Sequence, residues 1–98
     1  MGYSLHIDNA AYRIFRKLPK EVQTKIIDET VRLKTEPLVG EPLKGEYKRL
    51  RSLHFSYKGS AYRVIYQVFE KSSTIIIRLA ATRENIYRRL RKLKIPKP

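Results

Sequence analysis

Residues 62–83 read YRVIYQVFEKSSTIIIRLAATR, and this stretch decides the fold. Two runs rich in Val, Ile and Tyr are separated by the polar residues 70–73, a pattern that predicts a β-hairpin. Each run carries an arginine, Arg63 near the start of the first and Arg83 at the end of the second. In an antiparallel hairpin these two positions lie at the same end. Guanidinium groups bind phosphate oxygens in a fork, so the stretch predicts the floor of a phosphate-binding site.

The flanking segments predict the rest of an α+β domain. Strands are expected at residues 3–7, 47–57, 61–69 and 74–81, and helices at residues 9–18, 20–35 and 83–93. The order β-α-α-β-β-β-α predicts an antiparallel sheet packed against an N-terminal helical hairpin and a short C-terminal helix. The strand at 74–81 is apolar almost throughout. It is therefore expected to be covered on both faces by the chain itself, or on one face by a partner.

The length of 98 residues fits a single domain spanning residues 1–98. The chain has no cysteine, which excludes a disulfide framework and a thiolate metal site. It contains no apolar run long enough to span a membrane and no visible secretory signal. We therefore expect a cytoplasmic protein that makes no membrane contact.

The charge is strongly positive, with 22 Lys and Arg against nine Asp and Glu, a net +13. Only Glu70 and Glu84 among the acids follow residue 50, so the second half of the chain is the basic half. Such a balance favours polyanionic partners.

The usual enzyme motifs are absent from the sequence: it has no glycine-rich phosphate loop, no HExxH and no GxSxG, and its two histidines cannot build a metal cage. The remaining side chains suit RNA cleavage without a cofactor or metal. The 2′-hydroxyl of RNA can be the nucleophile, so the protein needs to align the linkage, neutralise its oxygens and move two protons. Arg63 and Arg83 can neutralise charge, and His54 and Tyr87 are the side chains best able to exchange a proton.

Four further basic side chains lie before or within the strand at 47–57 and are candidates for binding RNA phosphates: Lys44, Lys48, Arg49 and Arg51.

Three segments resemble the RelE/ParE superfamily of type II toxins: LKG at 43–45, YRVIYQV at 62–68 and ATRENIY at 81–87. The element order and length are also similar, so the resemblance covers nearly the whole chain. It implies a RelE-like fold over residues 1–98. It further implies a ribosome-dependent endoribonuclease (an mRNA interferase) that cuts mRNA in the ribosomal A site, inhibits translation and is held inactive by a cognate, RelB-like antitoxin.

The resemblance also implies roles for individual residues. Arg63 matches the family arginine of the third expected strand, at 61–69, and Arg83 the arginine that follows the fourth, at 74–81. Lys44 falls where the family often has arginine before a glycine, and His54 falls where the RelE toxin has a lysine. Tyr87 corresponds to the C-terminal tyrosine, at a shorter spacing from the preceding arginine than in the RelE toxin.

Two other functions fit the same residues. The ParE branch of the superfamily poisons DNA gyrase with the same scaffold and no nuclease chemistry. Alternatively, the chain is a non-catalytic basic module that binds RNA or the ribosome, with strongly salt-dependent affinity.

Overall fold

A five-stranded sheet organises the chain in a computed structural model that describes residues 2–93. The strands lie in the order β1-β5-β4-β3-β2. Their bounds are Ser4–Ile7 for β1, Glu41–Pro42 for β2, Leu50–Tyr57 for β3, Ser60–Phe69 for β4 and Thr74–Thr82 for β5. The three long strands β3, β4 and β5 are antiparallel neighbours, and they correspond to the three long strands expected from the sequence.

Three α-helices complete the domain, and the predicted α+β class is confirmed. Their bounds are Asn9–Phe15 for α1, Lys20–Thr30 for α2 and Arg83–Lys92 for α3. Single 3₁₀ turns follow α2 (η1, Val31–Lys34) and precede β3 (η2, Gly45–Tyr47). Asp8 caps α1, because its Oδ1 accepts a hydrogen bond from the Ala11 amide at 2.9 Å.

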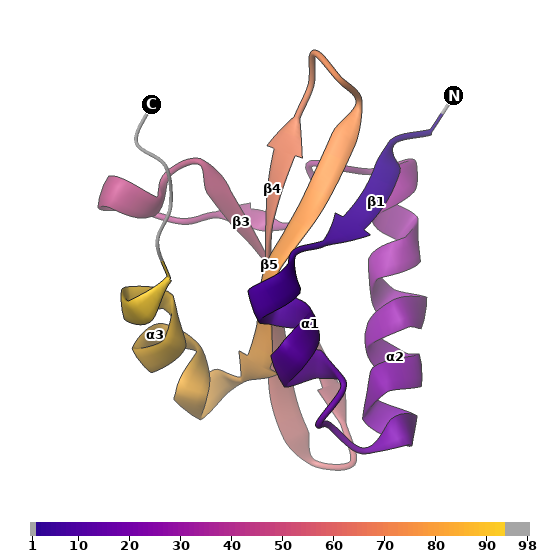
Figure 1. Cartoon of the computed structure of the whole chain (residues 1–98), viewed down its shortest axis with the longest axis vertical. Helices are drawn as coiled ribbons and strands as arrows, with labels where there is room; N and C mark the ends of the chain where they lie inside the picture. Colours follow the sequence, from indigo (N-terminus) through magenta and orange to yellow (C-terminus); the bar gives the residue numbers. More distant parts are fainter. Residues whose placement is uncertain (1, 94–98) are drawn as a thin grey trace.

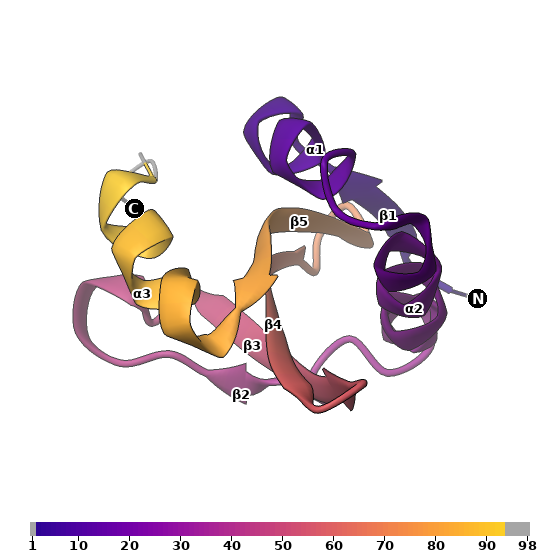
Figure 2. The same ribbon diagram turned by 90° about the horizontal axis from the view of Figure 1, so that it is seen from below.

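Both faces of the sheet are covered. On one face, α2 packs its buried Val22 and Ile26 against side chains of β3, β4 and β5. On the other face, Ile86 and Leu90 of α3 pack against a smaller cluster that includes Leu50 and Ile65. Figures 1 and 2 show α2 and α3 on opposite sides of the twisted sheet, with α1 beside β5.

Each long strand alternates between these two faces. In β4, Val64 and Tyr66 face α2, whereas Ile65 faces α3. A β-bulge in β5 interrupts the pattern, because Ile65 pairs with Leu79 while its neighbour Tyr66 pairs with Ile77. Arg78 is the extra residue, and beyond it the strand continues into the segment that starts α3.

The apolar run at 75–77 has an internal explanation. Ile75 and Ile77 are buried in the core under α2. The chain itself therefore covers the face of β5 that carries Ile75 and Ile77, whereas Ile76 on the other face is only partly buried.

One edge of the sheet differs from the expected all-antiparallel arrangement. Strand β1 pairs with β5 in parallel, with Ser4 beside Thr74 and Ile7 beside Ile77. Residues 8–73, which include β2, β3 and β4, separate these two strands in the sequence. Their pairing therefore depends on contacts between distant segments. No helix within residues 2–93 has the length and apolar character required to cross a membrane.

Candidate functional site

A cleft of about 460 Å³ opens on the face of the sheet that carries α3. Strands β2, β3 and β4 form its floor, and α3 and the segment before η2 form its walls. Its lining is Glu41, Pro42, Leu43, Lys44, Tyr47, Ser52, His54, Arg63, Tyr87 and Leu90. Four of the predicted site residues, which are far apart in the sequence, thus share one cavity: Lys44, His54, Arg63 and Tyr87.

Arg63 is the centre of this group. It is directly opposite His54 in the β3–β4 ladder, so the two side chains project from the same face. Its Nη1 donates a hydrogen bond to the Tyr87 Oη at 3.1 Å, and its guanidinium carbon lies 5.7 Å from the centroid of the Tyr87 ring. The cleft therefore combines a fixed cation, an imidazole and a phenol across three elements.

Arg83 lies beside the cleft without lining it. It is exposed and is the first residue of α3. Tyr87 follows four residues later, so both side chains project from the same side of the helix. Within residues 2–93, neither Arg63 nor Arg83 forms an ion pair with a carboxylate.

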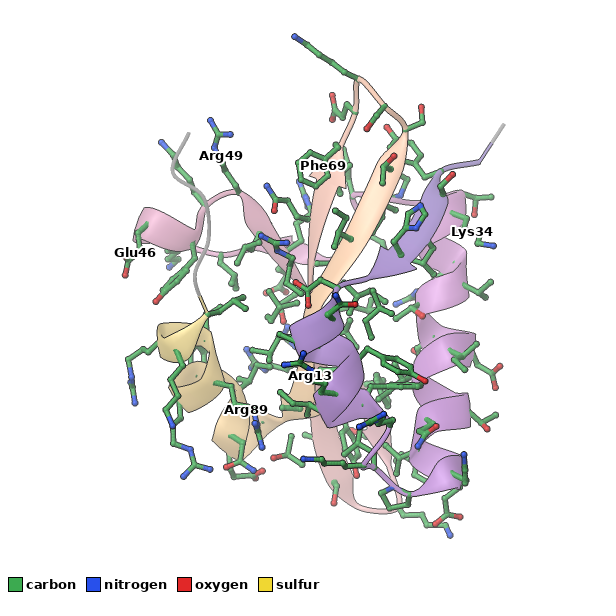
Figure 3. All side chains as sticks on the ribbon, in the orientation of Figure 1. Arg13, Lys34, Glu46, Arg49, Phe69 and Arg89 are labelled. Carbon is green, nitrogen blue, oxygen red and sulfur yellow. The ribbon has the colours of Figure 1, made fainter. Side chains whose placement is uncertain are left out.

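The other three predicted phosphate-binding residues lie away from the cleft. Lys48 and Arg49 are exposed in the turn between η2 and β3, and Figure 3 shows Arg49 pointing away from the sheet.

Arg51 requires a correction. In β3 it faces the α2 side, opposite to His54, because side chains of a strand alternate. Its Nη1 donates hydrogen bonds to the carbonyls of Leu38 and Gly40, the first at 3.0 Å. The guanidinium thus holds the loop before β2 and does not face the cleft.

Three polar residues of the lining were not predicted from the sequence: Glu41, Tyr47 and Ser52. Glu41 and Ser52 are paired across β2 and β3, so they share the cleft face. The short β2 contains a proline within a loop-like segment, and no periodicity marks it. Strand alternation from His54 could have identified Ser52, because the two are separated by one residue.

Two further observations bear on the chemistry of the cleft: one concerns the pKa of Tyr47 and the other concerns metal ligands. Burial, and then the charge of Glu46, raise the pKa of Tyr47, so this phenol stays protonated at neutral pH. Within residues 2–93, no group of three His, Cys, Asp or Glu side chains is arranged to hold a metal ion.

Comparisons with known proteins agree with this architecture. The sequence model of a family described as the ParE-like toxin of type II bacterial toxin–antitoxin systems matches residues 5–91. Toxin RelG of Mycobacterium tuberculosis is 31% identical over 91 residues, which covers 91% of this chain and 100% of RelG.

Solved structures show the same fold. The RelBE2 toxin–antitoxin complex of Mycobacterium tuberculosis contains a chain that is 27% identical, with a TM-score of 0.71, over 85% of this chain and 93% of that one. A mutant of the Escherichia coli toxin RelE in its free state has a TM-score of 0.74 at 20% identity, over 96% of this chain and 100% of that one.

The fold and these similarities define a toxin of the RelE/ParE superfamily, as the sequence predicted. The chain belongs to the ParE-like toxin family of type II bacterial toxin–antitoxin systems, and RelG is among its relatives.

Proposed function

We propose that this toxin is an endoribonuclease that cleaves mRNA in the A site of the translating ribosome and so arrests translation. The observation that supports this most strongly is the Arg63–Tyr87 contact at 3.1 Å, in a cleft that also contains His54 and Lys44. A guanidinium and an ammonium can hold the phosphate, while the phenol and the imidazole are placed to exchange protons.

The reaction needs one bond to form and one to break. The 2′-oxygen of the nucleotide attacks the adjacent phosphorus, the bond from phosphorus to the 5′-oxygen breaks, and the products end in a 2′,3′-cyclic phosphate and a 5′-hydroxyl. His54 or Glu41 accepts the proton of the 2′-hydroxyl. Tyr87 donates a proton to the leaving 5′-oxygen, because its own hydroxyl proton stays free while its oxygen accepts from Arg63.

Charge develops on the phosphate oxygens as the attack proceeds. Arg63 is held before the substrate arrives, so it stabilises this charge without reorganisation, and Lys44 adds a second cation at the cleft wall. Arg83, the first residue of α3, adds a third cation on the same side of the helix as Tyr87. We propose that this set of cations supplies the stabilisation without a metal ion.

The partners follow from the same proposal. The ribosome and its message are polyanions that suit a net charge of +13, and they place the toxin in the cytoplasm. The RelBE2 relative is a toxin–antitoxin complex, so we propose a cognate, RelB-like antitoxin for this chain.

The test is cleavage of a message on purified ribosomes stalled with an empty A site, by a chain that has been treated with EDTA and freed of it before it is added. We expect a cut in the A-site codon with the wild-type chain and none when the scissile nucleotide carries 2′-deoxyribose. Arg63→Ala and Arg83→Ala should each abolish cutting, whereas Arg49→Ala should not, because Arg49 does not line the cleft.

Each alternative function gives a different result. A DNA gyrase inhibitor would leave the message intact and produce double-strand DNA breaks in induced cells. A non-catalytic binding module would bind ribosomes with steep salt dependence and leave no cut product. Full activity of both Arg63→Ala and Arg83→Ala would contradict the assignment of the site.

A further inference from the structure

The cleft has two chemically different ends. His54 and Arg63 project side by side from the middle of the β3–β4 ladder, closer to the hairpin turn than Ser52 is. Toward the other end the lining is mostly apolar and aromatic (Pro42, Leu43, Tyr47 and Leu90), with Glu41 at its edge beside Ser52. Leu90 belongs to the core cluster beneath α3, and the partly buried Leu43 and Tyr47 pack against that cluster, so this end is a built part of the fold.

Ser52 lies at the floor of the cleft with an unsatisfied hydroxyl. It is 2% exposed, and its Oγ has no hydrogen-bond partner among the described residues. A buried hydroxyl without a partner is unfavourable, and such groups in native structures are uncommon. Its neighbours across the sheet are the buried, apolar Ile65 of β4 and the exposed Glu41 of β2, and neither gives the Ser52 hydroxyl a hydrogen bond within the described residues.

The distance between Ser52 and His54 along β3 suits a nucleotide. Ser52 and His54 are two residues apart on one face of β3, which separates their Cα atoms by about 6.7 Å. A ligand whose phosphate lies at Arg63 and His54 would extend along the strand toward Ser52. The part that arrives there must be flat and apolar on its faces and must carry a hydrogen-bonding edge, and a nucleobase has these properties.

We propose that the apolar end of the cleft is a nucleobase-binding subsite, in which Tyr47 supplies a stacking surface and the Ser52 hydroxyl bonds the edge of the base. The inference rests on the proposed function for its ligand, a single RNA strand. Stacking on Tyr47 accepts every base, whereas the hydroxyl distinguishes bases by their donors and acceptors. Ser52 is thus a specificity-determining residue.

The test measures binding and does not require cleavage. Four 2′-O-methyl dinucleotides that share one nucleotide and differ in the other base are titrated into the isotope-labelled chain at low salt, and the amide shifts of Ser52 and His54 are followed by NMR. We expect the four affinities to differ by about fivefold or more, the effect of one hydrogen bond.

Three variants test whether Ser52 and Tyr47 cause the base preference and the stacking. Ser52→Ala should bring the four affinities together, with a thermal midpoint unchanged or raised because an unpaired hydroxyl has gone. Ser56→Ala is the matched control, an exposed serine of the same strand and face outside the cleft lining, and should retain the differences. Tyr47→Leu should weaken all four ligands alike, by about tenfold.

Two outcomes would overturn the subsite: equal affinities in the wild-type chain, or a base preference that survives in Ser52→Ala. Cleavage is measured separately on ribosomes, so the two proposals can fail independently. A chain that binds with a Ser52-dependent preference and cuts no message supports the subsite and contradicts the nuclease. A chain that cuts and shows no base preference overturns the subsite alone.

Discussion

Tyr87 joins helix α3 to the sheet through its contact with Arg63, although its side chain remains 52% exposed. The ring and the hydroxyl have separate roles here. The ring faces the guanidinium, and the hydroxyl oxygen accepts its hydrogen bond. A substitution that removes only the hydroxyl therefore isolates its contribution.

We predict that Tyr87→Phe slows cleavage of ribosome-bound message by roughly ten- to a hundredfold, the effect of losing one hydrogen bond to a charged group. Tyr87→Ala should slow it further because the ring is lost as well. Single-turnover rates on programmed ribosomes measure both. An unchanged rate in Tyr87→Phe would show that the hydroxyl neither orients Arg63 nor donates a proton.

A second prediction at the scale of residues concerns the positive charge of Lys44. It lines the cleft, whereas Lys71 is an exposed lysine in the turn between β4 and β5, outside the cleft lining. We predict that Lys44→Gln reduces the slope of log K against log[salt] for ribosome binding by about 0.7–1, the contribution of one phosphate contact. Lys71→Gln should leave the slope unchanged. Equal effects of the two substitutions would mean that the whole charged surface, and not the cleft, binds the RNA.

At the scale of elements, side chains of β3 and β4 hold the loop before β2 in place. Tyr66 donates a hydrogen bond to the Pro37 carbonyl at 2.8 Å and accepts one from the Gly40 amide at 2.9 Å. Arg51 holds the same loop through the carbonyls of Leu38 and Gly40. A Cβ at position 40 would lie 2.6 Å from the Tyr66 hydroxyl, so this close approach requires glycine.

We predict that Tyr66→Phe destabilises the fold by about 1–3 kcal/mol, because the buried Gly40 amide and the partly buried Pro37 carbonyl lose their partner. The effect should also depend on pH. Burial raises the pKa of Tyr66, so its contribution is complete below the unfolded-state value near 10 and is lost as pH rises through the folded-state pKa. Thermal midpoints measured from pH 8 to 11 should therefore fall less steeply in Tyr66→Phe than in the wild type. Parallel curves would contradict the assignment.

Asp8 links α1 to β5 in two ways. It caps the helix, and its Oδ2 lies 3.3 Å from the Nη1 of Arg78, the extra residue of the bulge. We predict that Asp8→Asn retains the cap and loses the ion pair, whereas Asp8→Ala loses both and is less stable than Asp8→Asn by about 1 kcal/mol. Urea unfolding of the two variants measures this difference. Equal stabilities would show that the cap contributes nothing.

For the whole molecule, the long strands and helices could be predicted from local pattern. The runs rich in Val, Ile and Tyr at 61–69 and 74–81 predicted β4 and β5, and the segment at 83–93 predicted α3. The resemblance to known toxins brought His54, Arg63 and Tyr87 into one site, and the structure places all three in one cleft.

The features of the fold and the site that could not be predicted depend on contacts between distant segments. The parallel pairing of β1 with β5 and the short β2 have no local signature, so Glu41 could not be assigned to the site. Arg51 could have been excluded, because it alternates with Ser52 and His54 and must face the other way. Its hydrogen bonds to the loop could not have been predicted, because they depend on where that loop folds back.

The central claim is that the cleft around Arg63 cuts RNA, and mapping the 5′ ends of cellular mRNA after brief induction tests it most directly. With the wild-type chain we predict new ends at a fixed position within codons, and with a folded Arg63→Ala variant at equal abundance we predict none. New ends at the same positions and frequency in both would contradict the account.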